Sequence, residues 1–178
     1  MSQNNISDKA IIGKNVKIGS FNIIEENVTI EDDVEIGNYC HLRSGVVIKK
    51  RTRLMDYIEL RSNTIIGEDC YVDSKVSSSG NVIVKNNVTL RYDTILARGV
   101  EIGAKTYVCP RVMTNNLNSG GIEIGGAKIG ENCFIGTNAV LQHGITVGNN
   151  VIIGALSFVH KDCEAESTYV GIPAKKIK

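Results

Sequence analysis

Three histidines are the side chains best suited to exchange a proton near neutral pH, namely His41, His143 and His160. An imidazole with an ordinary pKa of about 6.5 can accept a proton from an attacking amine or hydroxyl group. His143 is the candidate base, because it lies eighteen residues before Lys161 and the sequence has a period that divides eighteen. The two side chains are therefore expected on one column of the fold. The alternative interpretation of His143 is an exposed corner residue without a chemical role.

A second candidate region is the one long interruption of that period, from Thr114 to Lys128, with the sequence TNNLNSGGIEIGGAK. Segments that interrupt a regular scaffold often carry functional residues, because they are free of the stacking constraint. The glycines lack the GxGxxG spacing and do not open a helix, so a dinucleotide site is not indicated. A tolerated surface insertion is the alternative.

A six-residue repeat must position these residues. From Ile12 to Val108 every sixth residue is aliphatic except Ser78, which makes sixteen of seventeen positions. A second set of small residues precedes each next aliphatic residue by two places, with only Asn22 out of character. After the interruption the frame resumes, shifted by three residues, at Ile129, Ile135, Leu141, Val147, Ile153 and Val159.

Neither a helix nor an alternating strand explains this spacing, whereas a short strand followed by a corner, three times per coil, does. Corners need backbone with positive φ, which Gly, Asn and Asp tolerate best. The fourth position of the repeat supplies such residues at Asn15, Asn27, Asp33, Gly45, Asn63, Asp69, Asn81, Asn87, Asp93, Gly99, Asn132, Asn138, Gly144, Asn150 and Asp162. The sequence thus predicts a parallel β-helix of triangular section with coils of 18 residues.

Composition limits the function classes. The chain has 178 residues, 42% hydrophobic residues, only 5% aromatic residues and no Trp, as suits one narrow core. A net charge of +1 gives no reason to expect binding to nucleic acid or to a membrane surface. The first residues carry no secretion signal and no apolar run could span a bilayer, so a cytoplasmic protein is expected.

The five cysteines do not indicate a disulfide framework. Cys40, Cys70, Cys133 and Cys163 all occupy the small inward position of the repeat, where a thiol packs as a small hydrophobe. Cys109 follows an inward aliphatic residue, so it is expected to point outward.

The pattern resembles the hexapeptide repeat of left-handed β-helix acyltransferases over roughly residues 10 to 165. The resemblance implies an all-β, left-handed parallel β-helix with one extended loop near residues 114–123. The chain is expected to be one domain, residues 1–178, with a polar leader at 1–10, the prism at about 11–165 and a C-terminal cap at 166–178. Members of this family are trimers, so a homotrimer is expected.

The second half of the chain resembles the acyltransferases of this family that use acetyl-CoA. The closing segment GIPAKKIK (171–178) is similar to their G-x-P-A-K ending, and IGALSFVHKD (153–162) is similar to their last coil. This resemblance implies an acetyltransferase that takes a short acyl group from acyl-CoA, with CoA in a groove between neighbouring prisms.

Within that family the segment Val112–Asn118 resembles the TND-type loop of sugar N-acetyltransferases that act on nucleotide-linked amino sugars. Asn116 stands where Asp is usual, and the loop has no His of the kind that sugar O-acetyltransferases carry there. N-acylation is therefore favoured over O-acylation, and both stay open. The candidate catalytic residues are Asn115 and Asn116, which would orient the amine, together with His143.

An extended pantetheine chain needs a flat wall with small side chains. Gly136 and Gly154 are eighteen residues apart, and so are Thr137 and Ala155, which predicts two adjacent columns of small residues for acetyl-CoA. Lys161, Lys175 and Lys176 are close enough in sequence to meet its phosphates, although an ordinary solvated tail is the alternative.

Two other classes share the prism. A non-catalytic scaffold would suit the long uninterrupted series of repeats before residue 114. The stretch Gly136 to Gly148 also resembles γ-type carbonic anhydrases, which hold zinc with three imidazoles. Thr137 and Gln142 stand where two of those imidazoles would be, so no metal is expected.

Overall fold

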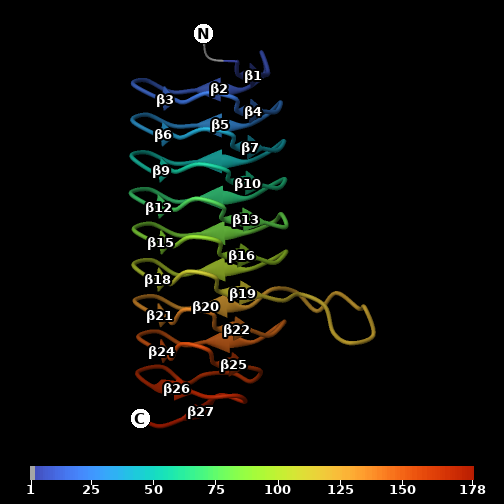
Figure 1. Cartoon of the computed structure of the whole chain (residues 1–178), viewed down its shortest axis with the longest axis vertical. Coiled ribbons are helices and arrows are strands. Elements are labelled where there is room, and N and C mark those ends of the chain that lie inside the picture. The colour runs from blue at the N-terminus through green and yellow to red at the C-terminus, as the bar shows by residue number, and fades with distance from the viewer. Residues whose placement is uncertain (1–2) are drawn as a thin grey trace.

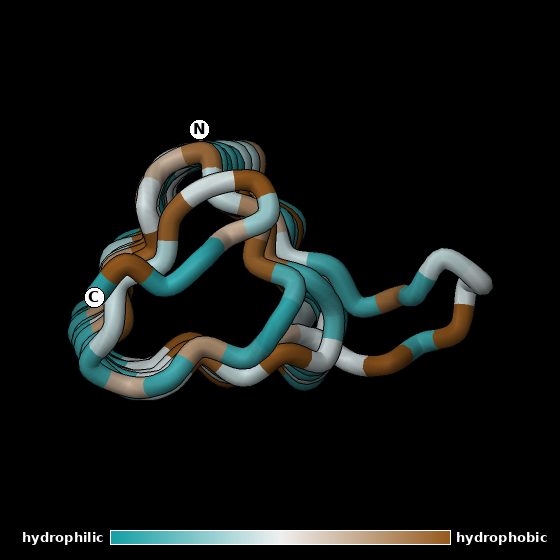
Figure 2. The backbone as a smooth tube through the Cα atoms, turned by 90° about the horizontal axis from the view of Figure 1, so that it is seen from below, coloured by the Kyte–Doolittle hydropathy of each residue, from teal (hydrophilic) through white to brown (hydrophobic). Residues whose placement is uncertain are grey.

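The computed structural model describes residues 3–178, which form a stack of coils with three flat walls (Figure 1). Viewed along the stack, the backbone is a triangle with a single long loop projecting from one corner (Figure 2). Each wall is a parallel sheet of two-residue strands, apart from the three-residue strand β26 and the antiparallel strand β27. The chain folds as the parallel β-helix predicted from the repeat, with the left hand that the family resemblance implies.

The strands of each sheet are separated by two strands of the other sheets. Sheet A contains β1 (Asn5–Ile6), β4 (Ile23–Ile24), β7 (His41–Leu42), β10 (Glu59–Leu60), β13 (Ser77–Ser78), β16 (Ile95–Leu96), β19 (Met113–Thr114), β22 (Val140–Leu141) and β25 (Phe158–Val159). Sheet B contains β2 (Ile11–Ile12), β5 (Thr29–Ile30), β8 (Val47–Ile48), β11 (Ile65–Ile66), β14 (Ile83–Val84), β17 (Glu101–Ile102), β20 (Lys128–Ile129) and β23 (Thr146–Val147). Sheet C contains β3 (Lys17–Ile18), β6 (Glu35–Ile36), β9 (Arg53–Leu54), β12 (Tyr71–Val72), β15 (Thr89–Leu90), β18 (Tyr107–Val108), β21 (Phe134–Ile135), β24 (Ile152–Ile153), β26 (Thr168–Val170) and β27 (Lys175–Lys176).

The repeat converts sequence separation into vertical contact. Ile66 pairs with Ile48 and Val84, each 18 residues away, and Ile129 pairs with Val147 on sheet B. The second residue of each strand from β4 to β25 points into the prism and is buried. These aliphatic side chains form one continuous core, as the series from Ile12 predicts.

The corners adopt positive φ every six residues, and at most of them from Asp33 onward the backbone N–H donates to the preceding coil. Tyr39, for example, has φ 57° and its N–H donates to Ser20 O at 3.0 Å. The Gly, Asn and Asp corners predicted from the sequence all have positive φ except Asp162. That prediction was wrong because the corner after β25 is two residues shorter. Val147 there bridges to Cys163, 16 residues away, instead of 18.

Polar residues in the core are paired, which explains why the repeat tolerates them. Ser78, the break in the aliphatic series, is 3% exposed, and its hydroxyl lies 2.7 Å from the hydroxyl of Thr64. A buried hydroxyl with a partner costs little, whereas an unpaired one costs about 1–3 kcal/mol.

All five cysteines are free and buried. The core placement predicted for Cys40, Cys70, Cys133 and Cys163 is confirmed. The exposed, outward placement of Cys109 was wrong, because the structure buries this side chain. Cys109 donates its N–H to Ile135 O of the next coil at 2.9 Å and is 8% exposed.

The two ends of the prism differ. Strand β1 lies inside the segment expected to be a leader and pairs with β4, so the stacking starts before residue 11. At the other end β26 continues sheet C, and β27 folds back antiparallel against it within the expected cap. The antiparallel turn ends the series of parallel coils.

The interruption of the repeat is an insertion between β19 and β20. Ile102 pairs with Ile129, and 129 − 102 is 27, so this coil is nine residues longer than the usual 18. The inserted residues leave the prism at the corner between sheets A and B, which we call the loop corner (Figures 1 and 2). The expected extended loop near residues 114–123 is present, and the chain rejoins the wall at Lys128.

Candidate functional site

The foot of the loop is fixed to the coil that follows it. Asn115 donates its backbone N–H to Leu141 O at 3.0 Å and its side-chain Nδ2 to Gln142 Oε1 at 3.0 Å. Thr114 is 3% exposed, and its hydroxyl accepts a hydrogen bond from Ala97 N at 2.7 Å in the preceding coil. The start of the loop is therefore held from both sides, and Asn115 is half-buried.

The loop itself is a small antiparallel turn. Leu117 bridges to Glu123, and the Oδ1 atom of Asn118 accepts hydrogen bonds from Gly120 N at 2.9 Å and Ile122 N at 3.0 Å. Asn116 contributes its backbone carbonyl, which accepts from Ile124 N at 2.9 Å. These bonds leave the side chain of Asn116 free to face a ligand.

His143 lies at the same corner, one coil further along the chain. Its ring is half-buried, and the Nδ1 atom is enclosed without a hydrogen-bond partner, the one such side-chain atom within residues 3–178. The returning arm of the loop is bonded to the neighbouring Gly144, whose N–H donates to Gly125 O at 3.0 Å. A Cβ on Gly144 would come within 2.8 Å of Ile124. His143 is therefore half-buried at this corner and not fully exposed, and its role as a base stays a prediction.

The structure thus brings Asn115, Asn116 and His143 to one corner, together with Gln142. Sequence reasoning missed Gln142 as a loop anchor. Its partner Asn115 is 27 residues away, and only the length of the inserted segment could have indicated the pair.

A hollow of about 300 Å³ lies beside the loop foot. The outer faces of two consecutive sheet A strands, at Ile95 and Met113, form its wall, and Asn115, Asn116 and Leu117 form its rim. The hollow is apolar on one side and amide-rich on the other. It can therefore hold a sugar ring face against the wall and its polar edge against the amides.

The small-residue columns predicted for CoA lie at a different corner, between sheets C and A. They stack as expected: Leu156 N donates to Thr137 O at 2.9 Å, and a Cβ on Gly136 would meet Ala155 N at 2.5 Å. However, Gly136 is buried under the next coil, and a Cβ on Gly154 would meet Val170 at 2.7 Å. The exposed part of the strip is therefore limited to Thr137 and Ala155.

The three candidate lysines do not lie close to one another within one subunit. Lys161 is exposed at the loop corner, whereas Lys175 and Lys176 lie on β27. Lys175 pairs with Val170, the residue that covers Gly154, so it lies near the small-residue strip. Lys176 is held by Glu164 at 2.6 Å, and this hydrogen bond raises the pKa of the Lys176 ammonium group.

Metal-binding clusters and membrane-spanning helices are both absent from residues 3–178. In this part of the chain no three His, Cys, Asp or Glu side chains lie close enough together to hold a metal ion. The same residues contain no helix that is long and apolar enough to cross a membrane.

A stacked triangular prism with a protruding loop defines a hexapeptide-repeat protein, and comparison with known proteins supports this class. The family model described as bacterial transferase hexapeptide (six repeats) matches residues 9–44 and 126–161. A maltose O-acetyltransferase from Clostridium difficile is 31% identical over 64% of this chain and 67% of its own, with a TM-score of 0.55. The chain belongs to the hexapeptide acyltransferase family.

A curated relative is the dTDP-4-amino-4,6-dideoxy-D-glucose acyltransferase of Escherichia coli. It is 33% identical over 116 residues, which are 60% of this chain and 57% of the relative. The chain spans between 19% and 57% of the curated relatives compared with it. LpxA from Acinetobacter baumannii shares the fold over 99% of this chain and 72% of its own, with a TM-score of 0.75 and 15% identity.

Proposed function

We propose that this protein transfers a short acyl group, such as acetyl, from acyl-CoA to a sugar acceptor. The observation that carries the proposal is the loop corner, where His143 has an enclosed, unpaired ring nitrogen beside the amides of Asn115 and Gln142. Because Nδ1 is enclosed by protein, the ring of His143 can meet a ligand only through Nε2. The family and the acyltransferases among its relatives point to the same chemistry.

The acceptor that fits best is a nucleotide-linked amino sugar. The loop sequence resembles that of the sugar N-acetyltransferases, and the E. coli relative is named for an amino sugar linked to dTDP. A neutral amine is a good nucleophile, so the site needs to orient it more than to activate it. The two asparagines supply carbonyl oxygens that can accept from the amine. O-acylation of a sugar hydroxyl is the less favoured outcome, because the loop carries no histidine of its own.

The reaction would proceed by addition and elimination. The amine nitrogen attacks the thioester carbonyl carbon, and the carbonyl electrons move to the oxygen to form an oxyanion. His143 takes the proton from the nitrogen through Nε2, the ring atom that is not enclosed. The oxyanion then re-forms the carbonyl group as the C–S bond breaks, and the CoA thiolate leaves and takes the proton from His143, which restores the neutral base. Positioning and stabilisation of the oxyanion by backbone N–H groups supply most of the rate enhancement.

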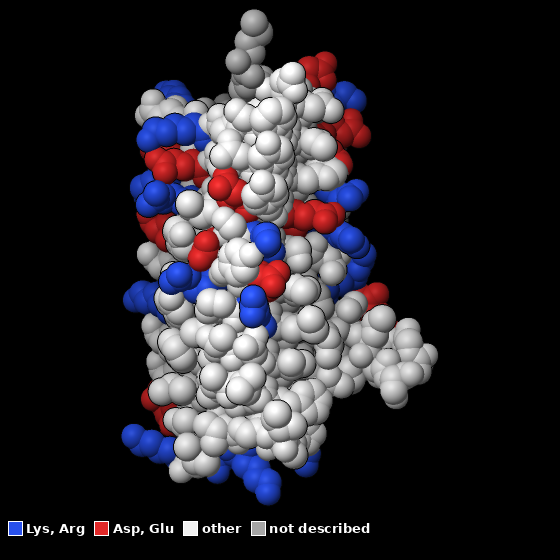
Figure 3. All heavy atoms as spheres, viewed as in Figure 1, with Lys and Arg blue, Asp and Glu red and all other residues white. Residues whose placement is uncertain are grey.

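The loop projects away from its own prism, which suggests that it contacts a second copy (Figures 1 and 2). Ile122 and Ile124 on the loop are 62% and 49% exposed, an unusual state for two aliphatic side chains on a protruding segment. On the face shown in Figure 3, charged side chains gather on the upper coils, whereas the centre from the level of the loop downward is nearly free of them. A homotrimer would bring such a loop onto a neighbouring prism and form the site between subunits.

Acyl-CoA would lie along the remaining strip of Thr137 and Ala155, with Lys175 near its phosphates. Ala155 is exposed, so Ala155→Trp adds bulk to the strip without entering the core. In a calorimetric titration with acetyl-CoA, this variant should lose binding while the trimer stays intact. Unchanged affinity would contradict this location for CoA.

The catalytic assignment is tested with His143→Gln, which keeps a polar side chain but cannot accept a proton. Thiol release from acetyl-CoA in the presence of an amino-sugar nucleotide should fall by about 10²–10⁴ in kcat, the usual contribution of a general base. His160→Gln is the matched control, since His160 is exposed and stacks on Phe158 with ring centroids 5.8 Å apart. Equal rates for both variants would remove His143 from the mechanism. If the wild-type protein releases no thiol with any acceptor and does not bind acetyl-CoA, the non-catalytic scaffold is favoured.

A further inference from the structure

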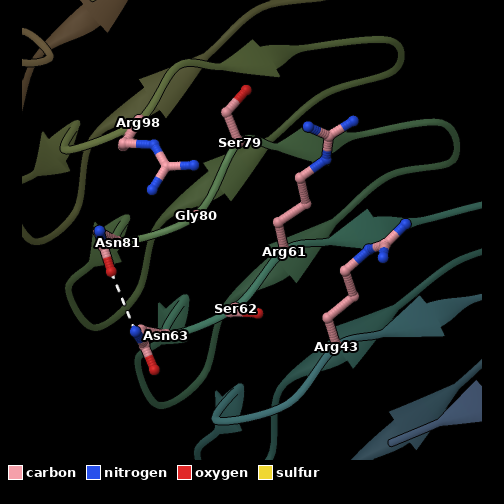
Figure 4. A pocket seen from close by; sticks show the side chains of 8 residues that line it. All are labelled: Arg43, Arg61, Ser62, Asn63, Ser79, Gly80, Asn81 and Arg98. Carbon is pink, nitrogen blue, oxygen red and sulfur yellow. Dashed lines mark hydrogen bonds between the residues drawn. The ribbon is translucent and has the colours of Figure 1, made fainter. Parts of the chain in front are cut away.

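A groove of about 490 Å³ runs along the loop corner, over the coils that precede the loop. Three arginines line it, Arg43, Arg61 and Arg98, and the part between Arg61 and Arg98 is formed by Ser79, Gly80 and Asn81. Figure 4 shows the side chains of Arg43 and Arg61 extending in the same direction from successive coils, with Ser79 between Arg61 and Arg98. Apart from Ser79, which also lines the hollow at the loop foot, none of these residues takes part in the acyl-transfer site described above.

The positive charge of the groove is only partly neutralised. Glu59 accepts hydrogen bonds from both Arg43, at 3.1 Å, and Arg61, at 3.4 Å, so one carboxylate serves two guanidinium groups. Partial burial raises the pKa of Glu59, but the hydrogen bond from Arg43 and the nearby charges of both arginines outweigh it and lower this pKa overall. Glu59 is therefore ionised at neutral pH, and one positive charge of the pair remains.

Arg98 is the third cation. Its nearest carboxylate is that of Glu123 on the loop, with Nε and Oε1 3.9 Å apart, which is too long for a hydrogen bond. Within residues 3–178 the terminal nitrogens of Arg61 and all three nitrogens of Arg98 donate no hydrogen bond to protein. Their N–H groups are therefore available to an anion from solvent.

Between these arginines Gly80 contributes no side chain to the groove, and Ser79 and Asn81 supply the side chains there. Gly80 is buried and has φ +96°, which only glycine adopts readily, and a Cβ there would lie 3.0 Å from Ser62 O. Asn81 accepts from Asn63 Nδ2 at 3.2 Å, which leaves its own Nδ2 free to donate. The groove thus combines guanidinium, amide and hydroxyl donors, the donor types that recognise phosphate oxygens.

The groove is continuous with the hollow at the loop foot, since Ser79 lines both. Asn115 is three coils beyond Arg61 at the same corner, which corresponds to about 14 Å at roughly 4.8 Å per coil. That span exceeds a single sugar ring, and it suits a sugar with an extended anionic group attached. Arg43, Arg61 and Arg98 also lie at separate points along the groove. Such an arrangement suits the two linked phosphate groups of a diphosphate, whereas a single carboxylate needs only one of these cations.

We propose that the groove formed by Arg43, Arg61 and Arg98 binds the diphosphate of the acceptor and so directs the attached sugar to the loop corner. This inference rests on the proposed acyl transfer for its biological meaning, but diphosphate binding itself can be measured without catalysis. The shared chemistry is a diphosphate group, which a nucleotide-linked sugar and free pyrophosphate both carry.

The binding experiment is calorimetric titration of the full chain with inorganic pyrophosphate at low ionic strength. Arg61→Gln should weaken binding roughly ten- to hundredfold, the range expected when a hydrogen bond to a charged group is lost. Arg111→Gln is the matched control, because Arg111 is similarly exposed and pairs loosely with Asp93 at a different corner; its affinity should equal that of the wild type. Equal weakening by both substitutions would show only diffuse charge attraction and would overturn the proposal.

Two further outcomes are informative. Glucuronate should bind much more weakly than pyrophosphate, and equal or tighter binding of glucuronate would replace the diphosphate with a carboxylate ligand and overturn the proposal. In the thiol-release assay Arg61→Gln should raise the KM for a nucleotide-linked amino sugar about tenfold or more, with a far smaller change in kcat. Acyl transfer without any binding of pyrophosphate would reject the groove alone. Binding that is lost in Arg61→Gln, without acyl transfer to any acceptor, would reject the proposed function alone.

Discussion

The Nδ2 atom of Asn115 donates a hydrogen bond of 3.0 Å to Oε1 of Gln142, a residue 27 positions later in the chain. This bond joins the first residue of the loop to the residue next to His143. The loop and the candidate base are thus parts of one arrangement. Any change at this pair is expected to act on the position of the loop and not on the core.

The first prediction concerns this pair. Asn115→Ala and Gln142→Ala should each lower kcat/KM for acyl transfer by about tenfold, since a partly buried hydrogen bond contributes about 0.5–1.5 kcal/mol and its loss frees the loop foot. The double variant should be little worse than either single variant, because both remove the same bond. Measured effects that simply add would show that the two side chains act separately.

A second prediction concerns pH. The hydrogen bond from Ser44 N and that from His41 lower the pKa of Glu25 below its ordinary value of 4.5. Because the folded state favours the ionised carboxylate, the associated stability is fully present above pH 4.5 and is lost as pH falls through the lower, folded-state pKa. The melting temperature of Glu25→Gln should be lower than that of the wild type at pH 7, and the two should converge in acid.

The control for that experiment is Glu26→Gln. Glu26 is the next residue, is exposed and pairs only with Lys9 on the surface. Exposed ion pairs of this kind contribute little to stability. A Glu26→Gln variant with the same pH-dependent loss as Glu25→Gln would contradict the role given to the Ser44 and His41 contacts.

A third prediction concerns the thiols. Burial raises the pKa of Cys40 and of Cys163 to about 11, and all five cysteines are enclosed. The thiolate is the reactive form, so a disulfide reagent at pH 8 should label the native protein only as fast as it opens, and label five thiols in denaturant. One thiol that reacts at once in the native state would place Cys109 at the surface after all.

A fourth prediction tests the core. Ile66 is completely buried between Ile48 and Val84, so Ile66→Ala should cost roughly 2–5 kcal/mol in the free energy of unfolding. Ile65, its neighbour on the same strand, points outward, and Ile65→Ala should cost much less. Chemical denaturation of the two variants gives the comparison, and similar losses would contradict the inward and outward assignment.

Most of the fold could be predicted from the sequence, because a strict six-residue period is compatible with only one arrangement of strands and corners. The aliphatic series from Ile12 fixed the wall positions, and the pairing of Ile129 with Val147 follows from it. The failures occurred where the period changes. Asp162 lies in a shortened corner, and Cys109 lies at a position that the repeat pattern treats as outward although the structure buries it.

The candidate site was predictable only in part. The inserted segment indicated the loop. The separation of 18 residues, one full coil, placed His143 and Lys161 at one corner. The pairing of Asn115 with Gln142 depends on how the inserted residues fold, which no period specifies. Val170 packs over Gly154, and this contact likewise depends on how β26 and β27 pair beyond the last regular coil.

The central claim is that this protein is an acyl-CoA-dependent acyltransferase, and thiol release tests it most directly. The purified protein is incubated with acetyl-CoA and a dTDP-linked amino sugar, and the free thiol of CoA is followed over time. The proposal predicts release that depends on the amino sugar and equals the amount of N-acetylated product. No release above the acceptor-free control, with amino sugars and with hydroxyl acceptors alike, would contradict it.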